Sequence, residues 1–256
     1  MDPRSSYDPD WFTPLAAVED RHFWFRSRNR VIGALAARIA AGLAPGCRVL
    51  EVGCGTGNVL RVLEQTCPAG AVVGMDLFGE GLDHARRRAR CPLLRGDLHQ
   101  PPFRARFALI GMFDVLEHLA DDAQALRDLG ALLEPGGVLM LSVPAHPALW
   151  SYFDEASGHH RRYREEELRR KLVEAGYRVQ YVTPYMAALL PLMWLGRSLC
   201  RGSGREAASL ELRVIPVLNE LLRLLLAPEA GWIARRRRLP FGASLLAVAT
   251  AGAARP

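Results

Sequence analysis

Residues 49–57, with the sequence VLEVGCGTG, decide the fold class. An apolar run ends at Val52 and leads directly into three glycines at alternate positions, Gly53, Gly55 and Gly57. Glycine lacks a Cβ atom and tolerates positive φ angles, so a ligand can pass close to this backbone. A helix that begins at the last glycine would add free N–H groups facing the same ligand. The stretch therefore predicts a buried strand, a tight turn and a helix around a ligand site.

Strand-like and helix-like segments alternate along the rest of the chain, which is typical of a parallel sheet with helices on both faces. We therefore expect an α/β fold built on a doubly wound, seven-stranded, mostly parallel sheet. The expected strands are residues 48–52, 71–77, 93–95, 107–113, 138–143, 178–185 and 241–250, with a turn at 134–137. The expected helices of the core are residues 57–67, 80–90, 120–133 and 164–176.

A chain of 256 residues, half of them apolar, is long enough for one substantial core, so we expect one domain overall. The predicted parts are an N-terminal helical cap (1–46), a ligand-binding core (47–185), a helical insertion or lid (186–240) and the final strand with a tail (241–256).

The insertion carries two apolar segments. Residues 185–195 are too few to span a bilayer, which takes roughly 20 residues. Residues 210–226 predict an amphipathic helix, and Pro216 places the start of its regular part. Leucines on one side of this helix would pack on the core, with Asn219, Glu220 and Arg223 on the opposite side.

The composition indicates an ordinary globular protein of a reducing compartment. The net charge is +6, but the basic residues are nearly all arginine, which favours a solvated surface over a nucleic-acid partner. Residues 1–14 lack the apolar stretch of a secretory signal, so we expect a cytoplasmic protein. The five cysteines have irregular spacing without a C-x-x-C pair: Cys47, Cys54, Cys67, Cys91 and Cys200.

Two acidic residues extend the predicted ligand site. Asp76 ends the next strand, 19 residues after Gly57, where a carboxylate can accept both hydrogen bonds from a ribose diol. Asp97 follows the third strand, where it could read an adenine amino group. A dinucleotide fingerprint would require a last glycine where Asn58 stands, so an NAD-dependent oxidoreductase remains only an alternative.

The motifs EVGCGTG (51–57), FDVLEHL (113–119) and LEPGGVLMLSVP (133–144), with Asp76 and Gly96-Asp97, resemble the successive motifs of class I methyltransferases. The resemblance covers residues 48–185 and implies a Rossmann-like methyltransferase fold. It also implies S-adenosylmethionine as cofactor and S-adenosylhomocysteine as product. The implied cofactor-binding residues are Glu51, Gly53, Gly55, Gly57, Asp76, Leu77, Asp97, Leu98, Phe113 and Asp114.

The residues after the fourth strand are the first candidates for catalysis, because ligands of open α/β sheets bind at the carboxyl ends of the strands. Glu117 and His118 could deprotonate a hydroxyl acceptor, or could merely brace the following helix. Together with Asp114 they resemble the D/E-x-x-E-H element of ubiquinone-biosynthesis O-methyltransferases and small-RNA 2′-O-methyltransferases. Some of those enzymes hold a divalent metal there, so a metal with His146, His159 or His160 as a further ligand also stays open.

The loop after the fifth strand should face the acceptor. Its residues, SVPAHP at 142–147 and GHHRRY at 158–163, resemble bacterial methyltransferases near polysaccharide and lipid pathways. We expect His160 to be catalytic. The expected substrate contacts are His146, Trp150, Arg162 and Tyr163.

The sequence after the predicted fourth strand limits the class of methyl acceptor. Residues 113–116 are FDVL, where enzymes that methylate amino groups of nucleobases or glutamine have N/D-P-P-Y/F. We therefore expect methyl transfer to oxygen of a small-molecule or lipid- or glycan-linked acceptor. A metal-assisted RNA 2′-O-methyltransferase and a non-enzymatic cofactor-binding protein are the other hypotheses.

A basic run, residues 235–238, follows the amphipathic helix. With this run, the insertion at residues 186–240 is compatible with peripheral contact to an anionic membrane surface, at the inner face of the membrane. A solvated loop beside a packed lid is the simpler explanation. The sequence indicates no oligomeric state.

Overall fold

The computed structural model describes residues 6–199 and 211–252, the side chains of residues 195–199 excepted. Cys200, the first residue of the predicted amphipathic helix and the end of the tail (253–256) lie outside the described residues. Within the described ranges, no helix is both long and apolar enough to cross a membrane.

The predicted seven-stranded sheet is confirmed, with the order β3-β2-β1-β4-β5-β7-β6. Neighbouring strands from β3 to β5 are parallel, whereas β7 is antiparallel to both β5 and β6. The strands are β1 (Arg48–Val52), β2 (Ala71–Asp76), β3 (Leu93–Arg95), β4 (Phe107–Phe113), β5 (Leu133–Pro144), β6 (Tyr177–Tyr185) and β7 (Ser244–Ala251).

Strand β5 is longer than predicted. It begins at Leu133, which pairs with Phe107, and the register then shifts before Leu109 pairs with Val138. The glycines and proline at residues 134–137 therefore form an irregular part of the strand and not a separate turn, because the pairing to β4 resumes beyond them.

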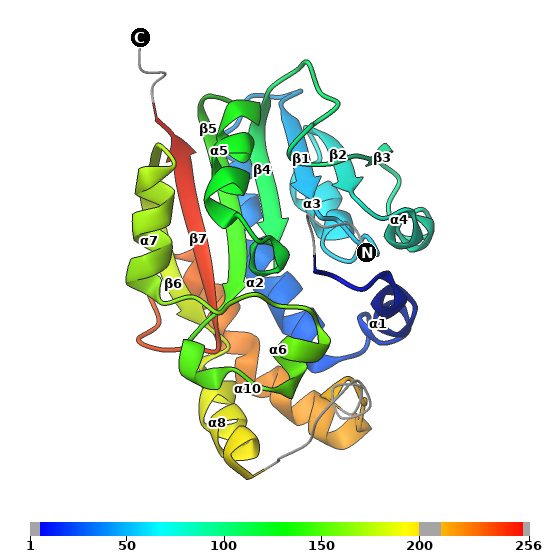
Figure 1. The fold of residues 1–256 in the computed structure, drawn as a ribbon, viewed down its shortest axis with the longest axis vertical. Coiled ribbons are helices and arrows are strands. Elements are labelled where there is room, and N and C mark those ends of the chain that lie inside the picture. Colours follow the sequence, from blue (N-terminus) through cyan, green and yellow to red (C-terminus); the bar gives the residue numbers. More distant parts are fainter. Residues whose placement is uncertain (1–5, 200–210, 253–256) are drawn as a thin grey trace.

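Helices cover both faces of the sheet (Figure 1). On one face lie α2 (Phe23–Ala40), α3 (Leu60–Thr66), α4 (Gly79–Ala85) and α10 (Pro216–Ala234), and on the other α5 (Asp122–Leu132) and α7 (Glu165–Glu174). Helices α3 and α4 are shorter than predicted: α3 begins three residues after the last glycine of the turn, and α4 ends before the arginine run.

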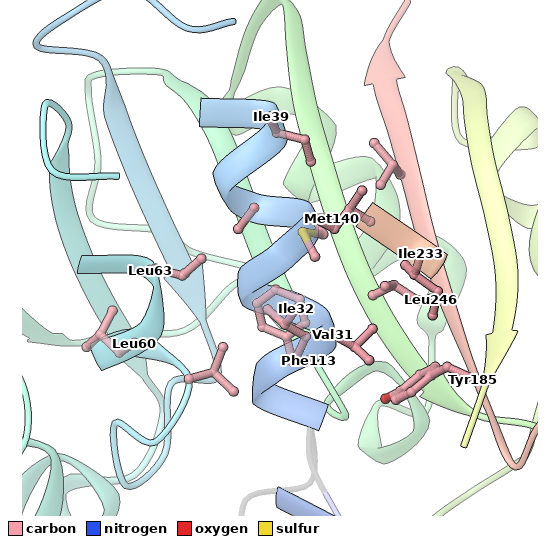
Figure 2. Packing of buried hydrophobic residues seen from close by; sticks show 14 of the residues in the cluster. Val31, Ile32, Ile39, Leu60, Leu63, Phe113, Met140, Tyr185, Ile233 and Leu246 are labelled. Atoms are coloured by element: carbon pink, nitrogen blue, oxygen red, sulfur yellow. The ribbon is translucent and has the colours of Figure 1, made fainter. Parts of the chain in front are cut away.

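Helix α2 shows why the N-terminal residues form a cap on the sheet. Its start is fixed by His22, whose Nδ1 accepts a hydrogen bond from the Trp24 N–H. Val31, Ile32 and Ile39 recur at helical spacing and pack on the sheet, as Figure 2 shows. The long helix therefore anchors the N-terminal region to the core and leaves residues 6–22 beyond the strand ends.

The carboxyl ends of the parallel strands are covered by short elements from distant parts of the chain (Figure 1). They are η1 (Pro9–Trp11), α1 (Phe12–Val18), η2 (Leu116–His118), η3 (Pro147–Leu149), α6 (Tyr152–Ala156), η4 (Ala187–Leu189), α8 (Leu190–Leu199) and the adjoining part of α10. These elements enclose the space in which the predicted ligand would lie.

The prediction that leucines of the amphipathic helix pack on the core is confirmed for Leu222 and Leu226 but was wrong for the leucines on the outer side. Helix α10 begins at Pro216 as expected, but Leu218, Leu221 and Leu225 are exposed, whereas Asn219 is buried. The Asn219 amide accepts a hydrogen bond from the Phe23 N–H and donates one to the Arg21 carbonyl. Two hydrogen bonds to the start of α2 thus orient the helix with its polar residue inward.

Candidate active site

The three glycines of the turn have the backbone that the sequence predicts. Their φ angles are +71° at Gly53, +49° at Gly55 and +77° at Gly57. Gly53 and Gly55 line the cavity described below, but Gly57 does not. A Cβ atom on Gly57 would lie 3.0 Å from the Cα of Ala85, so this glycine allows helix α4 to approach the turn.

A cavity of about 610 Å³ opens beside the glycine turn, within the size range of small-molecule sites. It extends from the ends of β1, β2 and β4 to the N-terminal cap, the α6 region and the insertion. Aromatic side chains make up most of the wall that the cap contributes: Tyr7, Trp11, Phe12, Phe23, Trp24 and Phe25. A largely apolar space with a few buried polar groups is typical of a site for an organic ligand.

Asp76 lies at the end of β2 and lines the cavity, as predicted. Its carboxylate accepts hydrogen bonds from the N–H groups of Gly55, at 2.7 Å, and Phe78, at 2.9 Å. Burial outweighs these bonds and raises the pKa of Asp76 to about 6. The carboxylate is thereby fixed against the turn.

Glu51 is a second buried carboxyl group in the cavity wall. Its Oε2 atom has no hydrogen-bond partner among the described residues. Burial raises the pKa of Glu51 well above its usual value, although the positive charge of Arg28 acts in the opposite direction. A buried, incompletely paired carboxyl group favours a cationic ligand group.

Asp114 lines the cavity in a left-handed backbone conformation, with φ +54°. It is held by Arg28, at 2.9 Å, and by the hydroxyl of Ser142, at 3.0 Å. The Arg28 guanidinium also lies 5.0 Å from the centroid of Trp24. Sequence reasoning missed Arg28, because its partner is 86 residues away and no local pattern marks the pair.

The N-terminal cap is fastened directly to the glycine turn. Glu19, at the end of α1, accepts a hydrogen bond of 2.5 Å from Thr56 and pairs with Arg88. Asp20 pairs with Arg61 at 2.8 Å. The cap thus closes one side of the cavity through charged contacts that sequence reasoning missed.

The remaining predicted cofactor residues also reach the cavity. Asp97 accepts a hydrogen bond from the His99 N–H at 2.9 Å, and its neighbour Leu98 is buried beside it. The predicted residues that line the cavity are Glu51, Gly53, Gly55, Asp76, Leu77, Asp97, Leu98, Phe113 and Asp114.

Glu117, His118 and His159 form a largely buried cluster in the cavity wall. The Nδ1 atom of His118 lies 3.3 Å from the Gly158 carbonyl, which can only accept, so Nδ1 carries the proton and Nε2 keeps its lone pair. Burial and the nearby His159 hold the pKa of His118 well below its usual value. His118 is therefore neutral near pH 7.

His159 is oriented by Asp154, which is fully buried in α6. The two side chains are joined at 2.9 Å from Nδ1 to Oδ1, and the same carboxylate accepts from Arg162 at 2.6 Å. Burial by itself would raise the pKa of Asp154, but these partners outweigh it and lower the pKa to about 2. The Asp154 carboxylate therefore stays ionised and holds the His159 ring in its orientation.

Glu117 completes the cluster. Its Oε2 atom has no hydrogen-bond partner among the described residues, and burial, reinforced by the charge of Asp114, raises the pKa well above normal. One ligand atom from each of Glu117, His118 and His159 lies within 4.8 Å of the others, so the three could together hold a metal ion.

The structure places several predicted acceptor residues outside the cavity. His160 and His146 are exposed, and Trp150 donates to Glu155 on the surface. Tyr163 is buried and bonds to Asp122 at 2.9 Å, which is a structural role. Among the predicted substrate contacts only Arg162 lines the cavity, and His159 takes the place expected for its neighbour His160.

The sheet order, the positive-φ glycine turn and the acid at the end of β2 define a class I S-adenosylmethionine-dependent methyltransferase. A family model described as a methyltransferase domain matches residues 22–182. The chain belongs to this family, and S-adenosylmethionine is its cofactor. The family match removes the NAD-dependent oxidoreductase alternative.

Curated relatives agree with the family. The chain is 33% identical over 132 residues to an S-adenosylmethionine-dependent methyltransferase of Mycolicibacterium smegmatis, covering 51% of this chain and 49% of that protein. It is 36% identical over 109 residues to a ubiquinone biosynthesis O-methyltransferase of Actinobacillus pleuropneumoniae, covering 38% and 45%. The chain thus spans about half the length of these relatives.

Solved structures share the fold at low identity. A methyltransferase from a complex with the Haloferax volcanii Trm112 methyltransferase activator superposes with a TM-score of 0.63 at 21% identity, covering 96% of both chains. The N-methyltransferase NodS of Bradyrhizobium japonicum, in complex with S-adenosylhomocysteine, has a TM-score of 0.54 at 17% identity, covering 92% of this chain and 90% of that one. These likenesses concern the fold alone.

Proposed function

We propose that this protein transfers the methyl group of S-adenosylmethionine to a hydroxyl oxygen of a small-molecule or lipid- or glycan-linked acceptor. The observation that carries the proposal is the Asp154–His159 pair, which lies next to His118 in the cavity wall. A hydroxyl must lose a proton when it is methylated, and a paired imidazole suits that task.

The cofactor end of the cavity fits S-adenosylmethionine. The buried carboxyl of Glu51, whose Oε2 atom has no partner among the described residues, would hold the ammonium group. The turn at Gly53 and Gly55 would face the carboxylate of the cofactor. Asp76 would accept from the ribose hydroxyls, and Asp97 with Leu98 would flank the adenine. When bound, the cofactor supplies a methyl group on a positively charged sulfur, which needs no further activation.

His159 is the proposed proton acceptor, and His118 its neutral neighbour. The ring centroids of the two histidines are 4.8 Å apart, so protonation of one disfavours protonation of the other. Asp154 would stabilise the positive charge that His159 gains when it accepts a proton, whereas the Nδ1 atom of His118 faces the uncharged Gly158 carbonyl. Glu117 and Arg162 would position the acceptor in the same part of the wall.

The acceptor should carry an apolar part, because aromatic and aliphatic side chains make up most of the wall between the cap and the insertion. Leu189 and Met193 of the insertion and Phe12 and Leu15 of the cap belong to this wall. A lipid-linked acceptor would bring a cytoplasmic enzyme to the inner face of a membrane.

The proposal is tested in two steps. Isothermal titration should show S-adenosylmethionine binding that Asp76→Ala weakens, with NAD as the negative control. Release of S-adenosylhomocysteine is then measured with a panel of hydroxylated aromatic, polyprenyl-linked and glycan-linked compounds. Turnover on amines but not on hydroxyls would contradict the oxygen assignment, and binding without turnover on any acceptor class would favour a cofactor-binding scaffold.

The second candidate is a metal-assisted RNA 2′-O-methyltransferase, favoured by the placement of Glu117, His118 and His159 around one point. In that case a divalent ion would activate the hydroxyl in place of a histidine base. Titration with Mn²⁺ or Zn²⁺ tests the site, with Glu117→Gln as the variant that should lose binding. Turnover that is insensitive to chelator and to excess RNA would exclude this candidate.

A further inference from the structure

Helix α10 carries an exposed apolar stripe along its outer side. Val217, Leu221, Leu224 and Trp232 follow one another at helical spacing, so they lie on one side of the helix. The exposed fraction is 75% for Val217 and 60% for Leu221. An apolar surface of this length is unfavourable in water unless another surface covers it. The α10 stripe consists of Val217, Leu218, Leu221, Leu224, Leu225 and Trp232.

The opposite side of α10 is fixed to the protein by polar residues. Asn219 is bonded to the start of α2. Glu229 accepts hydrogen bonds from the N–H groups of Met186, at 2.7 Å, and Ala187, at 2.8 Å. A rotation that buried the leucines would break these bonds, so the outward direction of the stripe is built into the fold.

Positive charge lies at the end of the stripe. Residues 235–238 are four consecutive arginines that follow directly after α10, and all four are exposed. The guanidinium of Arg237 lies 4.9 Å from the ring centroid of Trp232, and the Trp232 indole donates to the carbonyl of Arg238. Tryptophan and arginine together suit the headgroup region of a bilayer, because each has an apolar body and a polar end.

Apolar residues of the helices α8 and α10 also line the cavity. Leu192 of α8 is 52% exposed and also lines the cavity, next to Met193. Leu222 lines it from the flank of α10. Helices α8 and α10 lie together below the carboxyl ends of the strands (Figure 1). An apolar chain could therefore pass from the outer surface into the cavity along leucine and methionine side chains.

We propose that the α10 stripe and Arg235–Arg238 dock on the surface of an anionic lipid bilayer, from which the acceptor enters the cavity beside Leu192. An apolar helix face with clustered arginines matches the two components of such a surface, its acyl chains and its negative headgroups. The route of the acceptor rests on the proposed function, whereas the docking itself does not.

Flotation of the full chain with lipid vesicles tests the docking. The protein should float with phosphatidylcholine vesicles that contain phosphatidylglycerol, and less with phosphatidylcholine alone. Leu221→Glu should weaken binding by roughly tenfold or more, since it puts a charge into the centre of the stripe. Val173→Glu is the matched control, because Val173 is 59% exposed on α7, outside the stripe.

The electrostatic part has its own test. Arg236→Gln should weaken binding to the anionic vesicles by roughly fivefold. A high salt concentration should also weaken this binding, because it screens the charges. Binding that neither the salt nor this substitution changes would overturn the role of the arginines.

Three results would overturn docking on a bilayer. The first is no flotation with either vesicle. The second is an equal effect of Leu221→Glu and Val173→Glu. The third is a dimer in analytical ultracentrifugation that Leu221→Glu dissociates, without vesicle binding, which would assign the stripe to a second copy. Titration with S-adenosylmethionine on the same samples separates the two proposals, because a protein that floats without binding the cofactor refutes the proposed function and not the docking.

Discussion

The Nδ1 atom of His159 lies 2.9 Å from the Oδ1 atom of Asp154, and this hydrogen bond holds His159, rather than its neighbour His160, in the cavity wall. The backbone N–H of His159 also bonds to the Asp154 carbonyl at 2.8 Å, whereas that of His160 bonds to the Glu117 carbonyl. Consecutive residues point in different directions here, so His159 lines the cavity and His160 is exposed.

His159→Gln should reduce turnover by roughly 100-fold or more, because the proton acceptor is lost. The affinity for S-adenosylmethionine should stay the same, since Glu51 and Asp76 are unchanged. Release of S-adenosylhomocysteine and isothermal titration measure the two quantities. His160→Gln discriminates between the sequence-based prediction and the structure: a larger loss there than at His159 would contradict the arrangement described.

Glu51→Gln should have opposite effects on cofactor affinity and stability. Loss of a charged partner should weaken S-adenosylmethionine binding by roughly 10- to 100-fold. Burial holds the pKa of Glu51 above the value that it has in the unfolded chain. The free energy of unfolding therefore falls as the pH rises above the ordinary pKa of a carboxyl group, because the unfolded chain ionises more readily than the folded one. The neutral amide avoids this cost, and thermal melting of the cofactor-free variant at pH 7 should show a higher midpoint. Unchanged affinity would remove Glu51 from the site.

The affinity for S-adenosylmethionine should fall in mild acid. The pKa of Asp76 is about 6, and a protonated carboxyl can no longer accept both ribose hydrogen bonds. Affinity should therefore be constant above this pH and be roughly tenfold lower at one unit below it. Titrations at several pH values check the profile. Asp76→Asn is the control, because it should bind weakly and lose this part of the pH dependence.

Gly57→Ala should destabilise the protein more than Gly136→Ala. Both glycines have nearly the same φ, +77° and +76°, so the backbone cost of about 1–2 kcal/mol is shared. At Gly57 an added Cβ atom would meet Ala85, whereas nothing lies within 4 Å of the corresponding position at Gly136. Steric overlap should add about 1–3 kcal/mol in urea unfolding. An equal loss of unfolding free energy in the two variants would show that α4 can move away from the added Cβ atom without destabilising the protein.

Local sequence patterns were sufficient to predict the sheet and most of the residues that line the cavity around the glycine turn. The glycine turn and Asp76 are close in the chain, and their chemistry follows from backbone conformation and strand alternation, which are local properties. Glu51, Gly53 and Gly55 lie in the cavity wall, and their roles in cofactor binding stay predictions. Strand lengths were less certain, as β5 shows, because pairing with β4 bridges the irregular residues 134–137.

The cap and the acceptor half depend on tertiary contacts instead. Such contacts join residues far apart in the chain: Arg28 with Asp114 and Glu19 with Thr56 in the cap, and His118 with Gly158 in the acceptor half. No periodicity in the sequence encodes such pairs. The direction of α10 was decided in the same way, by the hydrogen bonds of Asn219 to the start of α2 together with the packing of Leu226 and Ile233 in the core. Local sequence sets which side of a helix is apolar, but only its packing partners set which side is buried.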